Sequence, residues 1–179
     1  KKAIDKLEFW YWVTLFSGDY RYRPNERAIE DIGKLLEWIK DTKNIKLEDG
    51  PFKDRYDKMF DAPEYDEAAL LHIDRSPCHT SLSKAILQFV LSQAPLDLIK
   101  HIRLTTWSAA QGEIALEDHH LVPLGSAKSF FESSRDIRKD RGHLLNSPIN
   151  RTYILKETNR TLGSESIASY SAKLGSGNI

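Results

Sequence analysis

The sequence predicts a mainly helical protein with a small α+β part, on the basis of two observations. Up to about residue 100, apolar residues recur at helical spacing in several separate segments. Near residue 104 the pattern changes to a mixture of β-branched, glycine and aromatic residues, which favours short strands over helices. We therefore expect an N-terminal helical bundle over residues 1–103 and a ββα module over residues 104–179.

The first two helices have the most regular patterns. Residues 3–16 carry apolar residues at helical spacing, together with an aromatic run at residues 9–12. We interpret this run as core or as an interdomain contact rather than as a surface for stacking bases. A second helix is expected from Glu26 to Lys40, with Asn25 as its N-cap and acidic residues in its first turns.

The rest of the N-terminal region is less regular. Residues 41–54 are polar and contain a Gly-Pro pair, which indicates a loop. A short helix is expected after Pro63 and ends near His72. Another helix, capped by Thr80 or Ser81, continues through the apolar residues 85–93.

The last third has the order of a ββα arrangement with an insertion. Residues 104–124 predict two short strands or a tight β-turn, and residues 149–155 predict a strand of alternating character. A helical turn fits residues 126–133, between them. The residues that follow the second strand return to a helical pattern, which Gly163 interrupts. We expect the module to span Leu116 to Tyr170.

Composition limits the classes of function. Basic and acidic residues balance at 26 each, so no overall field favours a polyanion, although a local patch can still bind one. A single cysteine excludes an internal disulfide and favours a reducing compartment. No run of about 18 apolar residues is present, so we expect no membrane span. Because the chain begins with Lys1 and has no starting Met, we expect it to be a piece of a longer protein.

Two adjacent histidines and two asparagines suit phosphodiester hydrolysis, which needs an activated water and a cation. They are His119 and His120, with Asn150 and Asn159 downstream. A neutral imidazole can take a proton from water at physiological pH. A second imidazole and an amide oxygen are neutral ligands that leave a divalent ion electrophilic. Adjacent strand residues point to opposite faces, so the two histidines should have different roles unless the backbone kinks between them.

This pattern, with eight residues between the two asparagines, resembles the HNH, or ββα-metal, nuclease motif. A longer match resembles the C-terminal half of GmrSD-type proteins, which are bacterial defence nucleases that act on modified phage or foreign DNA. The match covers residues 7–39, 85–93, 117–124 and 144–170.

The resemblance implies a role for each of these residues. His120 corresponds to the general base, and His119 and Asn159 correspond to ligands of a divalent metal ion, Mg²⁺ in the first place and Mn²⁺ as the alternative. Asn150 corresponds to the residue that holds the loop and orients the base. Asp118 lies outside the usual ligand position. It is a candidate for orienting one of the imidazoles without contacting the metal itself.

The resemblance also implies DNA as the partner and the bacterial cytoplasm as the location. From Asp118 to Arg160 the basic residues exceed the acidic ones by three. The family's N-terminal half, a sensing or nucleotide-hydrolysing domain, is absent from this chain and is an expected partner within the longer protein. The residues expected to contact nucleic acid are Arg138, Lys139, Arg141, Arg151, Lys156 and Arg160.

Two other functions remain open. One is a catalytically degenerate HNH fold that acts as a DNA-binding or assembly module. The other is an RNase or toxin-like nuclease of the same fold. A zinc site at His72, Cys78 and His79 lacks a fourth ligand at suitable spacing, so solvated or core residues are the preferred interpretation. His101 has no pattern around it, and His143 lies in the insertion.

Overall fold

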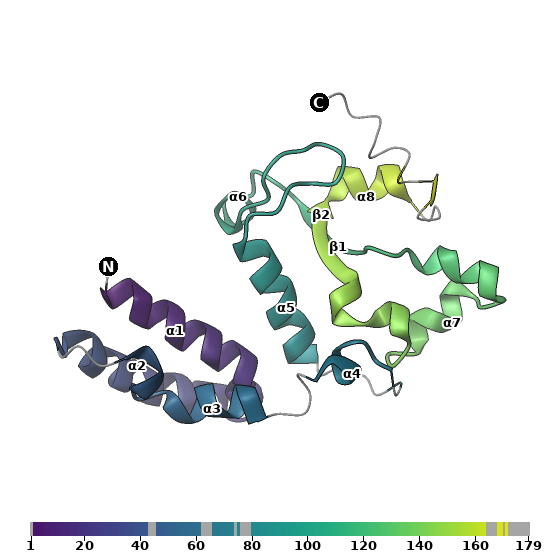
Figure 1. Cartoon of the computed structure of the whole chain (residues 1–179). Helices are drawn as coiled ribbons and strands as arrows, with labels where there is room; N and C mark the ends of the chain where they lie inside the picture. Colours follow the sequence, from purple (N-terminus) through teal and green to yellow (C-terminus); the bar gives the residue numbers. More distant parts are fainter. Residues whose placement is uncertain are drawn as a thin grey trace. The chain divides into compact units, whose positions relative to one another are not determined.

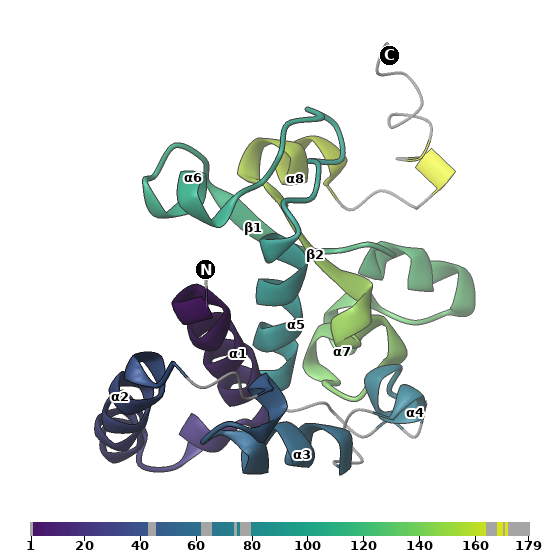
Figure 2. The same ribbon diagram turned by 60° about the vertical axis from the view of Figure 1, so that its left-hand side comes forward.

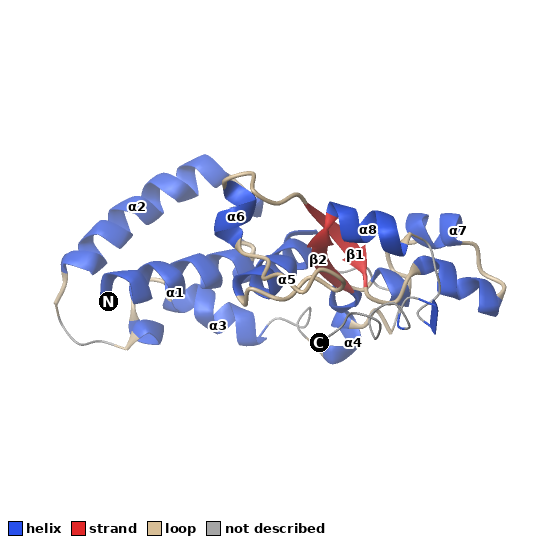
Figure 3. Ribbon diagram, turned by 90° about the horizontal axis from the view of Figure 1, so that it is seen from above, coloured by secondary structure: helices blue, strands red, loops and turns tan. Residues whose placement is uncertain are grey.

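The computed structural model describes most of the chain (Figure 1). The described residues are 2–42, 46–61, 66–73, 75, 80–163, 168–169 and 171, with the backbone alone at residues 128–130. The protein is mainly helical, with a small two-stranded antiparallel sheet (Figure 3). It divides into two compact units, one of residues 1–66 with 80–85 and one of residues 67–79 with 86–179. The boundary expected at residue 103 therefore lies inside the second unit.

The first unit is built on three helices. They are α1 (Lys2–Ser17), α2 (Pro24–Lys40) and α3 (Lys53–Asp61), with short 3-10 turns η1 (Asp19–Arg21) and η2 (Leu47–Asp49). Their core consists of Val13, Leu35, Trp38 and Phe52, and Phe9 and Trp10 pack against it. The start of the aromatic run is therefore core, as the helical pattern predicts, because it faces α2 and α3 rather than solvent.

A buried ion pair links these helices. Arg55 of α3 donates to both carboxylate oxygens of Asp31 of α2, at 2.6 and 2.8 Å, and to the hydroxyl of Thr14 of α1 at 2.7 Å. Trp10 and Tyr20 also donate to Asp31, each at 2.8 Å. Burial alone would raise the pKa of Asp31, but the hydrogen bonds from Arg55, Trp10 and Tyr20 outweigh it and hold the pKa below 3.8.

Two expectations about this unit were wrong. Helix α2 begins at Pro24 after Arg23 in a left-handed conformation, so Asn25 lies inside the first turn and is not the cap. The expected loop at residues 41–54 contains a 3-10 turn and the first residues of α3. Helix α3 carries few apolar residues: Tyr56 and Met59 pack against the core, and the buried side chain of Arg55 joins the helix to Asp31. Periodicity therefore gave no signal for it.

The second unit contains the sheet and several short helices. Helix α5 (Thr80–Ser92) has its first residues in the first unit and continues here. The other elements are α4 (Glu67–Leu70), α6 (Thr106–Ala110), β1 (Leu116–His120), η4 (Leu124–Phe130), α7 (Ser134–Lys139), η5 (Leu144–Asn146), η6 (Pro148–Asn150), β2 (Arg151–Leu155) and α8 (Lys156–Leu162). Strand, insertion, strand and helix thus follow in the order expected.

The strands β1 and β2 pair antiparallel, with Leu116 opposite Leu155 and His120 opposite Arg151. The order β1–β2–α8 leaves α8 continuing directly from the end of β2 (Figure 2). Ile154 of β2 and Leu162 of α8 are buried together. This packing fixes one face of α8 and sets the direction of the others.

The buried carboxylate of Asp97 holds the junction between β2 and α8. Its side chain is 1% exposed and accepts hydrogen bonds from the backbone N–H of Leu155 at 2.8 Å and the hydroxyl of Thr158 at 2.6 Å. It also accepts from the N–H groups of Ile99 and Lys100. Although burial opposes ionisation, these donors lower the pKa of Asp97 below its ordinary value.

The expectation of two strands over residues 104–124 was half wrong. The first part forms the short helix α6, with Thr105 as its N-cap, and only Leu116–His120 forms a strand. The second strand of the sheet is β2. The expected continuation of the last helix to Tyr170 falls largely outside the described residues, as do Pro63, Cys78 and His79. No described helix has both the length and the apolar character to cross a bilayer.

Candidate functional site

The end of β1 and the middle of α8 bring His119 and Asn159 together. His119 is 6% exposed, and its Nδ1 lies 2.9 Å from the amide oxygen Oδ1 of Asn159. The amide nitrogen of Asn159 donates to Glu117 Oε2 at 2.5 Å. Glu117 and His119 are two residues apart on β1 and so lie on the same face of the strand. Glu117 thereby orients the amide so that its oxygen is directed at the imidazole.

His119 Nδ1 and Asn159 Oδ1 lie at hydrogen-bond distance, and two neighbouring ligands of a divalent ion would have a similar spacing. Two ligands at about 2.1 Å on adjacent corners of an octahedron lie about 3.0 Å apart. The observed separation of Nδ1 and Oδ1 is 2.9 Å. Within the described residues no three His, Cys, Asp or Glu side chains converge on one point. An ion held by His119 and Asn159 would have two neutral protein ligands, with other positions open to water and substrate.

His120 has different partners from its neighbour. Its Nε2 lies 3.2 Å from the amide oxygen of Asn146 and 2.9 Å from the guanidinium of Arg151. Burial, and then the positive charge of Arg151, lowers the pKa of His120 to about 4. The ring is therefore neutral at physiological pH, which is the form of a base rather than of an acid.

The contacts of Asn146 and Arg151 with Nε2 compete. The amide nitrogen of Asn146 donates to the carbonyls of Ile137 and Asp140, so its oxygen faces His120 and can only accept. Arg151 can only donate. Nε2 can make one of these hydrogen bonds at a time, and the bond from Arg151 requires the tautomer with its proton on Nδ1.

Asp118 contacts Arg151 rather than an imidazole. Its carboxylate accepts a hydrogen bond of 2.7 Å from Arg151 Nε and a second from the terminal nitrogen of the same side chain. Asp118 therefore acts on His120 through Arg151. Arg151, which the sequence analysis expects to contact nucleic acid, lies against His120 instead.

Asn150 clamps the turn that follows the histidine pair. Its Oδ1 accepts from the N–H of Val122 at 2.8 Å, and its Nδ2 donates to the carbonyls of Val122 and Leu145, at 3.1 and 2.8 Å. Its own carbonyl accepts from the N–H of Leu121 at 2.9 Å. The side chain thus holds the loop and contacts neither histidine.

A small cavity of about 160 Å³ adjoins both histidines. They border the same space because they are the last two residues of β1, where the chain turns away from the sheet. Arg138 of α7 also lines the cavity and makes no ion pair within the described chain. The other lining residues are Asp118, Pro123, Leu124, Gly125, Ser134, Asn159 and Gly163.

The remaining predicted residues lie elsewhere. Lys139 and Arg141 do not line the cavity. Lys156 and Arg160 of α8 line a separate pocket. His143 pairs with Glu132 at 3.0 Å and caps η5, and buried His72 lies 3.3 Å from the carbonyl of His143, so both have structural partners. His101 is exposed.

Glu117 and Asn146 were not identified from the sequence. Glu117 had an available signal, because it precedes His119 by two residues on a strand and must share its face. Asn146 had none, because it lies in the insertion, and only the folded loop brings it to His120.

Comparison with known proteins shows that the chain is similar to an archaeal protein. The chain is 24% identical over 174 residues to a protein of Methanocaldococcus jannaschii that is described only as uncharacterized. The match covers 93% of this chain and 25% of the relative, so the chain spans about a quarter of that protein's length. No family model matches the chain, and no solved structure matches it significantly.

Proposed function

We propose that this chain is a metal-dependent HNH endonuclease or nickase domain that hydrolyses DNA, the effector part of an anti-phage or restriction system. The observation that carries the proposal is the pairing of His119 with Asn159 at 2.9 Å beside the same cavity that His120 lines. The order β1–β2–α8 and the hydrogen bonds of Asn150 support the proposal, because the resemblance implies a ββα order and an asparagine that holds the loop.

In this proposal His119 and Asn159 hold a divalent ion, Mg²⁺ or Mn²⁺. Such an ion would stabilise negative charge on the phosphate and on the leaving oxygen. Glu117 keeps the oxygen of Asn159 directed at the ligand position. Arg138 lines the same cavity and has no ion pair within the described residues, so in this proposal it contacts a phosphate oxygen.

His120 is the proposed base, and Nε2 is the atom that takes the proton from water. The guanidinium of Arg151 lies 2.9 Å from that atom, so it must move before water can approach. A phosphate in the cavity offers the guanidinium an alternative acceptor. In this proposal Arg151 blocks Nε2 of His120 in the free protein and contacts the substrate in the complex.

The same contact favours one alternative function. A guanidinium that stays on Nε2 would leave His120 unable to act as a base, and the module would bind DNA or assemble without cutting it. A second alternative, an RNase of the same fold, uses the same residues on a different nucleic acid.

Incubation of the chain with supercoiled plasmid, and separately with RNA, distinguishes these functions. We expect plasmid nicking with Mg²⁺ or Mn²⁺, loss of nicking with EDTA, and loss in His120→Ala. His101→Asn is the matched control, because it replaces an exposed histidine away from the cavity. Plasmid binding with no metal-dependent cleavage would favour the degenerate module. Cleavage of RNA alone would favour the RNase.

Target choice is proposed to lie outside this chain. The relative is about four times as long as the matched segment, which leaves room for a further domain in a protein of this kind. The resemblance places a sensing or nucleotide-hydrolysing domain before the nuclease, in a cytoplasmic protein.

A further inference from the structure

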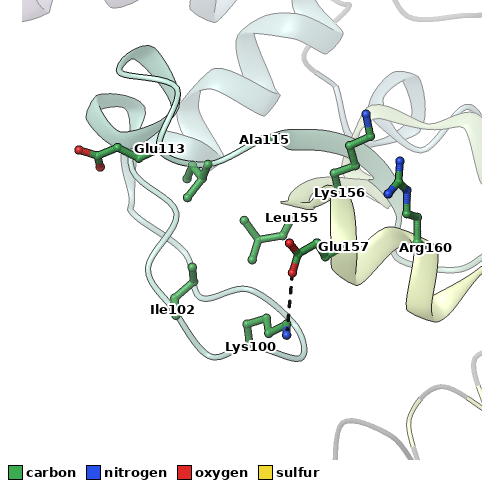
Figure 4. A pocket seen from close by; sticks show the side chains of 9 residues that line it. Lys100, Ile102, Glu113, Ala115, Leu155, Lys156, Glu157 and Arg160 are labelled. Atoms are coloured by element: carbon green, nitrogen blue, oxygen red, sulfur yellow. Dashed lines mark ion pairs between the residues drawn. The ribbon is translucent and has the colours of Figure 1, made fainter.

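A second pocket, separate from the histidine cavity, lies along another face of α8 (Figure 4). Its volume is about 560 Å³, within the range of small-ligand sites. It shares no lining residue with the smaller cavity. The residues that line it are Lys100, Ile102, Glu113, Ile114, Ala115, Leu155, Lys156, Glu157 and Arg160.

Two unpaired cations stand on one side of this pocket. Lys156 and Arg160 are four residues apart on α8, so their side chains are neighbours on the helix surface. Figure 4 shows both projecting to the same side. Both are exposed, and neither side chain has an ion pair or hydrogen bond within the described residues. An ammonium beside a guanidinium suits a phosphate group, which accepts from both.

Within the described residues, neither acidic residue of the pocket forms an ion pair with Lys156 or Arg160. Glu157 lies 3.9 Å from Lys100, which supplies its counter-charge. Figure 4 shows Glu113 directed away from Lys156 and Arg160. The end of the pocket at Lys156 and Arg160 is therefore positive.

The remaining wall is apolar. Ile102 is 44% exposed, and Ile114 is half-buried. Leu155 forms the deeper part of the wall and packs into the core beneath. A site with two cations at one end and aliphatic side chains at the other suits a ligand that carries a phosphate next to a flat apolar ring.

We propose that this pocket binds a nucleotide, with its phosphate on Lys156 and Arg160 and its base against Ile102 and Ile114. The nucleotide is either a free mononucleotide or one unit of a nucleic-acid strand. The inference goes beyond the proposed nuclease activity, because the pocket needs neither the histidine pair nor a metal ion.

The test measures binding to the whole chain by calorimetry in EDTA, with 5′-dAMP, deoxyadenosine and inorganic phosphate as probes. We expect 5′-dAMP to bind about tenfold more tightly than either fragment, because only the nucleotide uses both ends of the pocket. The double variant Lys156→Ala/Arg160→Ala should bind 5′-dAMP at least about tenfold more weakly. Arg135→Ala, which removes an exposed arginine outside the pocket, is the matched control.

A second variant tests the apolar end. Ile102→Ser should lower the affinity for 5′-dAMP severalfold and leave the affinity for inorganic phosphate unchanged. A single-stranded trinucleotide identifies the source of the ligand: tighter binding than 5′-dAMP, with the same response to the variants, assigns the site to a strand, and equal binding assigns it to a free nucleotide. Either result supports the pocket.

The proposal is overturned if inorganic phosphate binds as tightly as 5′-dAMP, or if the double variant and Arg135→Ala lose affinity equally. Both outcomes would mean that the pocket is an ordinary charged surface. Because these measurements contain no metal and read no cleavage, they are independent of the plasmid assay. The nucleotide-binding proposal can be wrong while the nuclease proposal is right, and the nuclease proposal can be wrong while the nucleotide-binding proposal is right.

Discussion

Asp97 accepts a hydrogen bond of 2.6 Å from the hydroxyl of Thr158, the residue that precedes Asn159 on α8. The same carboxylate accepts from the N–H of Leu155, the last residue of β2. One buried side chain thus fixes the angle at which α8 leaves the sheet. The position of Asn159 relative to His119 depends on that angle, although Asp97 contacts neither residue.

Asp97→Asn should therefore affect both the stability of the protein and the proposed metal site. Every partner of the carboxylate is a donor, so an amide NH₂ would face an N–H or O–H. We expect a loss of about 2–3 kcal/mol in the free energy of unfolding. We also expect weaker Mn²⁺ binding in the fraction that stays folded. Urea unfolding and calorimetry measure the two effects, and Asp136→Asn, on the exposed side of α7, is the control. Unchanged stability would show that the junction does not depend on the charge.

The importance of Asp97 could not be read from the sequence. It occurs among polar and apolar residues without a motif, and the two partners that join it to β2 and α8, Leu155 and Thr158, lie about 60 residues further along the chain. Periodicity predicts elements such as α1 and β2 because their apolar residues face a core. It does not predict which buried carboxylate satisfies the backbone where two elements join.

Substitutions of His119 and of His120 should have different effects on metal binding. His120→Ala removes the proposed base, so cleavage should fall by about 10²–10⁴-fold while Mn²⁺ affinity changes little. His119→Ala and Asn159→Ala each remove a proposed ligand, so each should weaken Mn²⁺ binding and slow cleavage. Calorimetry with Mn²⁺ on the three variants, beside plasmid nicking, makes the comparison. Loss of Mn²⁺ binding in His120→Ala with normal binding in His119→Ala would exchange the two roles.

The buried ion pair between Arg55 and Asp31 should stabilise the first unit. Arg55→Met leaves the carboxylate of Asp31 buried without its counter-charge, and the cost should be about 3–5 kcal/mol of unfolding free energy. Lys53→Met is the matched control, because Lys53 pairs with Asp57 on the surface, where solvent screens the pair, and its loss should leave the free energy of unfolding nearly unchanged. Equal losses in the two variants would mean that Arg55 stabilises the unit only by its packing.

The same pair gives the unit a defined response to acid. The pKa of Asp31 is lowered in the folded protein, so its stabilisation is complete above the ordinary value of 3.8 and is lost as the pH falls through the lower folded value. Arg55→Met removes the largest group of donors and leaves burial, which raises the pKa of Asp31. Acid unfolding of the variant should then begin at a higher pH than that of the parent protein. Circular dichroism during an acid titration follows the transition, and an unshifted midpoint would contradict the assignment.

The candidate site was predictable in part. The histidine pair and the two asparagines could be selected from spacing and resemblance, and the paired strands place His119 and His120 at the end of β1. The partners of His120 could not be predicted, because Asn146 and Arg151 reach it only through the fold of the insertion and the register of the sheet. Cross-strand pairing of His120 with Arg151 follows from register, which a short strand pattern does not specify.

The isolated chain should hold DNA weakly and with a strong dependence on salt. The residues proposed to contact phosphate are few: Arg138 and Arg151 near the histidines, and Lys156 and Arg160 on α8. Four phosphate contacts correspond to a slope of about −4 for log affinity against log salt concentration. Arg138→Gln should make this slope shallower by about one, whatever the sequence of the DNA.

Because phosphate contacts carry no sequence information, the chain by itself should also cut without regard to modification. We expect slow, metal-dependent nicking of modified and unmodified plasmids at the same rate, at low salt, with activity lost at moderate salt. Parallel time courses on the two plasmids at both salt concentrations measure this. Tight cleavage that selects the modified plasmid would contradict the proposal that target choice lies outside this chain, and would place recognition within these 179 residues.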